Sequence, residues 1–223
     1  MKIRHAVIIL LMMTLFLIGC SSNNKTNEAR LPEYEETEAV PVVTMTMENG
    51  GEVEIALYPN VARNTVNNFI YLVEQGFYDG LTFHRVIPGF MIQGGDPEGT
   101  GIGGPGYSIV GEFQNNGYEN DLKHERGVIS MARSQHPDSA GSQFFIMVDK
   151  AEHLDGDYAA FGEVISGMEV VDEIVNVERD QVDKPLEDQV IKSMTIELNG
   201  YEYEEPIKIG SLSNSVGHVE IKA

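Results

Sequence analysis

The sequence predicts a mainly β protein, a closed antiparallel β-barrel that is capped by two α-helices. Two observations support this fold class. Short segments in which apolar and polar residues alternate recur along the chain, with turn residues between them. Only two segments have the apolar spacing of an amphipathic helix. Because many short strands with few helices are typical of barrels, we expect that architecture.

The first two strands are expected to form a β-hairpin. Apolar residues alternate with polar ones from 43 to 48 and again from 52 to 57. Between these segments, Asn49-Gly50-Gly51 has the composition of a tight turn. The alternation predicts that one face of the hairpin is buried.

The first helix is expected directly after this hairpin. Its apolar residues follow at intervals of 3, 1, 3 and 4 positions, at Val66, Phe69, Ile70, Val73 and Phe77. Thr65 is the expected N-cap, and Gly76 is a plausible stop. The second helix is expected near 167–177, where one face carries Met168, Val171, Ile174 and Val175.

The remaining strands are expected at 87–93, 127–132, 144–148, 159–164 and 190–198. The final segment, 201–223, is acidic at first and then contains serine, asparagine and glycine. This composition is compatible with an added strand pair and with a loose tail, and the sequence does not decide between them.

The N-terminus has the layout of a secretory signal. Lys2, Arg4 and His5 precede an apolar run at 6–18, which is too short for a comfortable membrane span. The run ends next to Cys20, the only cysteine of the chain. This arrangement resembles a bacterial lipoprotein signal, in which the cysteine becomes the lipidated first residue. The alternative is an ordinary signal peptide with an incidental cysteine.

Four segments are therefore expected: a lipoprotein signal peptide at 1–19, a flexible acidic tether at 20–40, a globular domain at 41–200 and a C-terminal extension at 201–223. Removal of the signal leaves 13 basic against 35 acidic residues, a net charge of −22. Such a surface repels nucleic acid, so no nucleic-acid partner is expected. With a single cysteine, the domain has no internal disulfide. We expect a monomer.

The segment Phe83 to Asp96, with the sequence FHRVIPGFMIQGGD, carries the strongest functional signal. It places one guanidinium, Arg85, among aromatic and apolar residues, with the amide of Gln93 nearby. A nucleophile with a neighbouring acid or base is missing from this set. A fixed cation, an apolar pocket and neutral hydrogen-bonding groups suit a reaction that moves no proton and breaks no bond. Rotation about an Xaa–Pro peptide bond is such a reaction.

The chain from about 41 to 200 resembles the cyclophilins, peptidyl-prolyl cis-trans isomerases with a β-barrel fold. FHRVIPGFMIQGGD is a long match, and three further blocks follow it in the order found in the family. They are Ile129-Ser130-Met131-Ala132, Gly141-Ser142-Gln143-Phe144-Phe145-Ile146, and His153-Leu154-Asp155-Gly156 followed by Phe161-Gly162.

The resemblance implies roles for particular residues. Arg85 would be the catalytic cation, and the proline pocket would consist of Phe90, Met91, Phe145 and Leu154. The substrate main chain would be held by Gln93, Gln143 and the backbone near Ala132 and Arg133. His153 and Tyr158 stand where well-known eukaryotic members carry a tryptophan and a histidine that contact bound ligands. Without the indole of that tryptophan, weak cyclosporin binding is expected.

The two resemblances together imply a cellular role. A lipid anchor on Cys20 would hold the isomerase at the outer face of the cytoplasmic membrane, where it would act on proline-containing segments of exported proteins. The alternative is a proline-peptide-binding module or holdase with little turnover.

The glycine-rich segment 101–106 satisfies the dinucleotide-binding pattern GxGxxG but lacks the βαβ context that such a site needs. The histidines lack metal-binding spacing, and Ser142 is not in a nucleophile elbow. Neither a metal nor a cofactor is expected.

Overall fold

The computed structural model describes residues 35–210 of the 223-residue chain. The expected signal peptide, Cys20 and most of the expected tether lie outside the described residues, as does the end of the C-terminal extension from 211 onward. Within 35–210, no helix has the length and apolar character that a membrane span requires.

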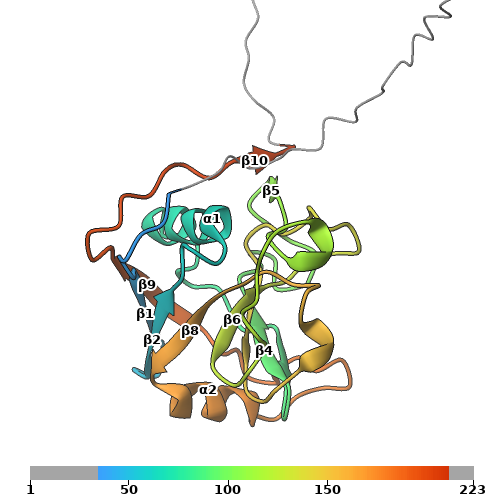
Figure 1. Ribbon diagram of the computed structural model, residues 1–223. Helices are drawn as coiled ribbons and strands as arrows, with labels where there is room; N and C mark the ends of the chain where they lie inside the picture. The colour runs from blue at the N-terminus through green and yellow to red at the C-terminus, as the bar shows by residue number, and fades with distance from the viewer. Residues whose placement is uncertain (1–34, 211–223) are drawn as a thin grey trace, which may run out of the picture.

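The elements follow one another from the N-terminal hairpin to a short C-terminal strand (Figure 1). They are β1 (Val42–Met47), β2 (Glu52–Leu57), α1 (Arg63–Glu74), β3 (Arg85–Ile87), β4 (Met91–Gly94), β5 (Ser108–Ile109), η1 (Gln114–Asn116), β6 (Val128–Met131), β7 (Phe144–Met147), η2 (Glu152–Leu154), β8 (Ala160–Ser166), α2 (Met168–Val175), β9 (Ile191–Glu197) and β10 (Lys208–Ile209).

Eight strands form one curled antiparallel sheet in the order β3-β4-β7-β6-β8-β2-β1-β9. The expected closed barrel is wrong, because no ladder joins β3 to β9 and the sheet remains a half-barrel. A single bridge, Thr82 to Val190, connects the segment before β3 to the start of β9. On β3 itself, the Val86 N–H donates to the carbonyl of Asp183, which precedes β9 (2.8 Å). The connection between α2 and β9 thus occupies the edge of β3 that closure would need.

The two expected helices and the hairpin are present. β1 and β2 pair as predicted, and α2 begins after Gly167 within one residue of the predicted start. The expected single strand at 87–93 is wrong, because residues 88–90 form a turn between β3 and β4. Pro88 cannot donate a ladder hydrogen bond, and Gly89 adopts a positive φ of 72°. Together they reverse the chain in the middle of the apolar run.

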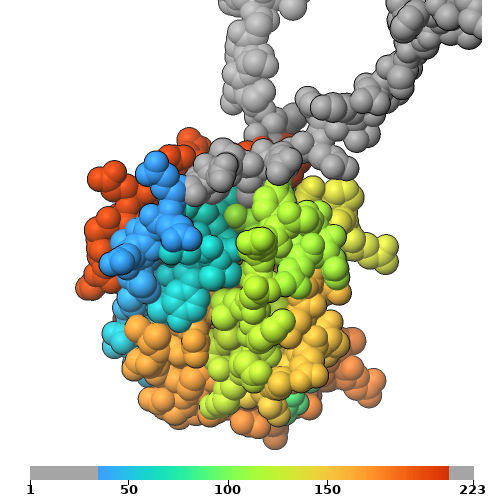
Figure 2. Space-filling model, viewed as in Figure 1, coloured from blue at the N-terminus to red at the C-terminus, as the bar shows by residue number. Residues whose placement is uncertain are grey.

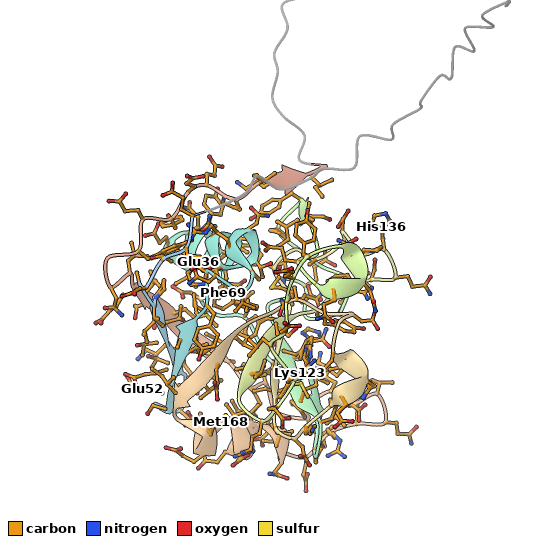
Figure 3. All side chains as sticks on the ribbon, viewed as in Figure 1. Glu36, Glu52, Phe69, Lys123, His136 and Met168 are labelled. Atoms are coloured by element: carbon orange, nitrogen blue, oxygen red, sulfur yellow. The ribbon has the colours of Figure 1, made fainter. Side chains whose placement is uncertain are left out.

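The main core lies inside the curl of the sheet, beneath α1. Phe69 of α1, labelled in Figure 3, contacts three aromatic rings there. Its ring centroid lies 5.1 Å from that of Tyr78, 5.5 Å from that of Phe144 and 5.2 Å from that of Phe161. All four side chains are fully buried. The two helices lie at opposite ends of the curled sheet (Figure 1).

The N-terminus of α1 is capped by a residue from a distant loop. The expected cap, Thr65, lies inside the helix, and the N-cap position is Ala62, which has no side-chain cap. The carboxylate of Glu112 instead accepts the N–H of Asn64 (3.1 Å), the N–H of Thr65 (2.7 Å) and the Thr65 hydroxyl (2.6 Å). Burial raises the pKa of Glu112, and these three donors oppose that effect. A carboxylate here satisfies free helix N–H groups and complements the helix dipole.

The described part of the C-terminal extension adds one short strand, which pairs with a strand of the domain. β10 pairs antiparallel with β5, Lys208 lying opposite Ile109. The extension is tied to α1 by the Tyr201 hydroxyl, which donates to Asn67 (2.6 Å), and by Asn64, which exchanges two hydrogen bonds with the backbone of Ile207 (2.8 and 3.2 Å). In Figure 2 the red C-terminal segment lies against the blue and teal N-terminal elements.

Replacing the buried cap should weaken the whole fold. The Glu112→Gln variant exchanges one acceptor oxygen for an NH₂ group that faces the N–H donors of α1. Leaving buried donors unsatisfied costs about 1–3 kcal/mol, so we expect the free energy of unfolding to fall by about 2 kcal/mol. Urea denaturation measures this change. Glu119→Gln, at an exposed position of the same loop, is the matched control and should change stability by less than about 0.5 kcal/mol.

Candidate active site

Strand register aligns a row of side chains across the outer face of the sheet. Arg85 of β3 lies opposite Gln93 of β4, Gln93 lies opposite Phe145 of β7, and Phe145 lies opposite Ser130 of β6. Side chains of directly paired residues project from the same face, with Cβ atoms about 5 Å apart. The guanidinium, the amide and the aromatic ring therefore come together from three different strands.

A second apolar cluster on this outer face supports the row. Its buried members are Met91, Val128, Phe145, Met147, Ala151, Leu154 and Ala160, and the partly buried Ile87, Phe90, Leu122, Ala132 and Tyr158 pack against them. The main core lies on the other face of the same strands. The candidate site thus rests on a sheet that packing holds from both sides, which gives its side chains a rigid base.

A cavity of about 210 Å³ opens on this cluster. All nine residues that line it belong to the predicted set: Arg85, Phe90, Met91, Gln93, Ala132, Arg133, Phe145, Leu154 and Tyr158. The structure therefore brings together residues that lie up to 73 positions apart in the chain. Its lining combines aromatic and aliphatic side chains with the amide of Gln93 and the guanidiniums of Arg85 and Arg133.

The two other predicted residues lie beside this cavity. The ring of His153 is exposed and stacks on that of Phe90, with centroids 5.7 Å apart and an interplanar angle of 29°. Gln143 accepts a hydrogen bond from the Gln93 amide (2.9 Å) and donates to the carbonyl of Gly103 (2.9 Å). Gln143 therefore links the cavity to the glycine-rich loop at 101–106.

Arg85 is exposed on the short strand β3. Among the described residues, its guanidinium has neither a hydrogen bond nor an ion pair, unlike that of Arg126, which pairs with Asp172. A guanidinium has five N–H donors and stays charged at every physiological pH. Those donors are available to a ligand in the cavity.

The glycine-rich loop is fixed by a buried carboxylate. Asp96 accepts the backbone N–H groups of Glu98 (2.8 Å), Thr100 (3.0 Å) and Gly101 (2.5 Å). Burial alone would raise the pKa of Asp96, but these donors outweigh it and lower the pKa. At Gly103 a Cβ atom would stand 2.0 Å from the Asp96 carboxylate, so only glycine fits. The loop consequently presents backbone groups to the space beside Gln143.

A buried histidine supports the floor of the cavity. His124 stacks on Phe145, with ring centroids 6.0 Å apart, and lies edge-on to Tyr158 at 6.5 Å. Its Nδ1 lies 3.0 Å from Asp155 Oδ1, and its Nε2 lies 3.1 Å from the Ser130 hydroxyl. With an ionised Asp155, Nδ1 is the donor and the neutral ring accepts from Ser130 at Nε2. The buried Ser130 hydroxyl is therefore a structural group and not an accessible nucleophile.

The side chain of Arg133 has internal partners. Its guanidinium lies 4.7 Å from the ring centroid of Tyr158 and 5.0 Å from that of Phe113. It also donates two hydrogen bonds to the carbonyl of Asp157 (2.9 and 2.7 Å). Arg133 thus holds Tyr158 against the cavity, whereas the sequence suggested only its backbone as a binding group.

Sequence reasoning did not assign a role in the site to His124, Ser130, Asp96 or Asp155. Asp96, Ser130 and Asp155 fall in the blocks that carried the resemblance, so their place in those blocks was the available signal. For His124 no local pattern exists, because its partners are 6 to 31 residues away in the chain. Within residues 35–210, no group of three or more histidine, cysteine, aspartate or glutamate side chains is placed to hold a metal ion.

Comparison with known proteins places these features in a family. The family model for "Cyclophilin type peptidyl-prolyl cis-trans isomerase/CLD" matches residues 42–196. Peptidyl-prolyl cis-trans isomerase B of Bacillus subtilis (strain 168) is 50% identical over 130 residues, covering 58% of this chain and 87% of that protein. A Helicobacter pylori peptidyl-prolyl cis-trans isomerase is 43% identical over 152 residues, covering 67% and 88%.

Solved structures agree with the sequence relatives. The crystal structure of a cyclophilin-type isomerase from Cryptosporidium parvum in the presence of the dipeptide Ala-Pro superposes with a TM-score of 0.64 at 34% identity. The match covers 70% of this chain and 98% of that one.

Two buried histidines should make stability depend on pH. Burial lowers the pKa of His84 and of His124, whereas an unfolded histidine has a pKa of about 6.5. Below that pH the unfolded chain binds more protons than the folded one, so the free energy of unfolding falls as pH decreases. We expect a loss of about 1–2 kcal/mol between pH 7.5 and 5.5, measured by urea denaturation.

The His124→Gln variant tests the origin of this dependence, because glutamine does not titrate. The variant should show a shallower pH dependence than the wild type. An unfolding free energy that is the same at pH 7.5 and 5.5 in the wild type would show that the two rings titrate alike in both states.

Proposed function

The chain belongs to the cyclophilin-type peptidyl-prolyl cis-trans isomerase family, and we propose that the 210 Å³ cavity is its catalytic site, with Arg85 as the catalytic cation. The observation that carries this proposal is the lining of the cavity. A hollow of this size, lined by Phe90, Phe145 and Leu154, suits a pyrrolidine ring. At its edge stands the Arg85 guanidinium, which has no hydrogen-bond or ion-pair partner among residues 35–210. The Ala-Pro dipeptide in the Cryptosporidium structure supports a proline-containing ligand.

Arg85 would act on the prolyl nitrogen. Resonance draws the lone pair of that nitrogen into the carbonyl and creates the partial double bond that resists rotation. A donor directed at the nitrogen holds the lone pair there and weakens the double bond in the twisted transition state. Because the guanidinium remains charged, it contributes as a fixed donor and not as a proton shuttle.

Arg85 is too weak to account for catalysis alone. An acceleration of about 10⁵ requires close to 7 kcal/mol of differential stabilisation. One charge-assisted hydrogen bond supplies about 1.5–3 kcal/mol. The remainder would come from holding the twisted substrate on both sides of the bond, with the proline ring against Phe145 and the main chain along Gln93 and Gln143. The buried His124 and the stacked Arg133 contribute by keeping Phe145 and Tyr158 in place.

The N-terminus supports a cellular role for this isomerase. The apolar run at 6–18 and Cys20 support export and lipid attachment, which would hold the enzyme at the extracytoplasmic face of the cell membrane. There the substrates would be proline-containing segments of exported proteins as they fold. The acidic segment up to about residue 40 would serve as the tether.

Loss of the catalytic cation should abolish most of the turnover. In Arg85→Ala we expect kcat/KM for a short Xaa-Pro peptide to fall by about 10- to 100-fold, the equivalent of one charge-assisted donor. Arg85→Lys keeps the charge but lacks the planar guanidinium, so its kcat/KM should lie between those of the wild type and Arg85→Ala. Exchange spectroscopy by NMR on the purified full-length protein measures the cis/trans rate directly.

Controls separate this effect from a damaged fold. Lys192→Ala removes an exposed cation from β9 that does not line the cavity, and should keep wild-type rates. A folded wild-type protein without any acceleration would overturn the catalytic assignment. Line broadening of the peptide signals without exchange would instead indicate the proline-binding module or holdase.

The anchor is tested through Cys20. In the expected host, a bacterium that processes lipoproteins, wild-type protein should sediment with membranes and partition into detergent. The Cys20→Ser variant has no thiol to receive a lipid and should lose the lipid-dependent detergent partitioning. Equal partitioning of both proteins would contradict lipidation and favour the incidental cysteine.

A further inference from the structure

A larger cavity of about 650 Å³ adjoins the proposed catalytic site. The two cavities share three residues, Gln93, Ala132 and Arg133. Beyond these residues the larger cavity is bounded by the glycine-rich loop, by the segment around Gly141 and by the C-terminal extension through Ile209 and Gly210. It is therefore continuous with the smaller cavity, and one of its walls comes from outside the segment that the family model matches, 42–196.

The position of this wall is fixed by contacts with the rest of the domain. In β10, Ile209 lies opposite Ser108 of β5, which also lines the larger cavity. The Lys208 ammonium lies 4.0 Å from the ring centroid of Tyr71 and 5.0 Å from that of Tyr107. Tyr107 itself lines the cavity, and its hydroxyl donates to Asn68 of α1 (2.8 Å). The extension is thus held against the cavity by charge, ring and backbone contacts.

The chemistry of the larger cavity suits an extended polypeptide. Its glycine-rich side presents main-chain N–H and C=O groups, and the Asp96 carboxylate fixes their conformation. The C-terminal extension adds Ile209, whose aliphatic side chain is half-buried. A surface that combines backbone groups with a few apolar side chains can bind an extended main chain and contact its side chains locally.

We propose that β10 is part of the substrate groove and that Ile209 and Gly210 contact residues flanking the Xaa-Pro pair on one side. This inference rests on the proposed function, because it assumes that the proline occupies the smaller cavity. A substrate that continues past the Gln93–Gln143 pair advances about 3.3 Å per residue and enters the larger cavity within a few residues. The C-terminal extension therefore discriminates among substrates by their flanking residues, while a minimal Xaa-Pro peptide does not reach it.

The test compares peptides of different length on matched variants of the full-length protein in detergent. A blocked Xaa-Pro peptide is compared with one extended by four residues before Xaa and one extended by four residues after proline. Ile209→Trp projects a large ring into the cavity wall. Ile207→Trp makes the same change two residues earlier in the chain, at a residue that does not line the cavity.

For one of the extended peptides, kcat/KM should be about fivefold or more lower in Ile209→Trp than in the wild type, because the new ring fills part of the pocket. The minimal peptide should keep its rate in that variant, and Ile207→Trp should keep both rates. In the wild type, the same extended peptide should shift the amide NMR signals of Ile209 and Gly210, which the minimal peptide leaves unchanged.

The possible failures are distinguishable. If the wild type turns over no peptide, the proposed function is wrong, and the amide shifts still decide whether an extended peptide reaches β10. If the minimal peptide is turned over but neither extended peptide shifts the Ile209 and Gly210 amides, the groove assignment is overturned alone. Equal rate losses for minimal and extended peptides in Ile209→Trp would also overturn it, because the variant would then act through the fold.

Discussion

Strand β7 is buried on both of its faces, and the position of the site follows from that constraint. Phe144 and Ile146 point into the core beneath α1, whereas Phe145 and Met147 point into the outer cluster. Because each face is packed, β7 cannot slip in register without moving apolar side chains to the wrong cluster. The same register places Phe145 opposite Gln93, so that only β4 lies between Phe145 and Arg85. The register of β7 that packs the core therefore also fixes the geometry of the site.

Hydrogen bonds of buried polar groups hold the neighbouring loops against α1. Asn68 donates to the carbonyl of Gly141 (2.8 Å), Asn64 binds the backbone of the C-terminal extension, and Glu112 caps the helix from the loop after β5. Each bond joins the helix to a segment that lies near one of the two cavities. A buried polar group without its partner is costly, so these segments are fixed in one arrangement. The helix therefore acts as a scaffold for the groove as well as a cover for the core.

The sequence predicted the helices and most strands because their signals are local. Alternation and helical spacing need only neighbouring residues, as in the hairpin β1–β2 and in α2. The predictions were wrong where a segment distant in the chain supplies the hydrogen-bond partner. Glu112 and not Thr65 satisfies the N-terminus of α1, and Asp183 takes the edge of β3 that a closed barrel would need. The turn at Pro88-Gly89 was missed because the apolar run continues across it.

By itself, the sequence determined the family, through four ordered blocks, and the residues that line the smaller cavity. Those residues could be named because the family motifs contain them or lie close beside them in the chain. The tertiary structure alone decided which further residues support them. His124 packs under Phe145, Arg133 is held by Asp157, and the C-terminal extension forms a wall of the larger cavity. The physical reason is the same in each case: these contacts join segments far apart in the chain, and no local pattern of residues encodes them.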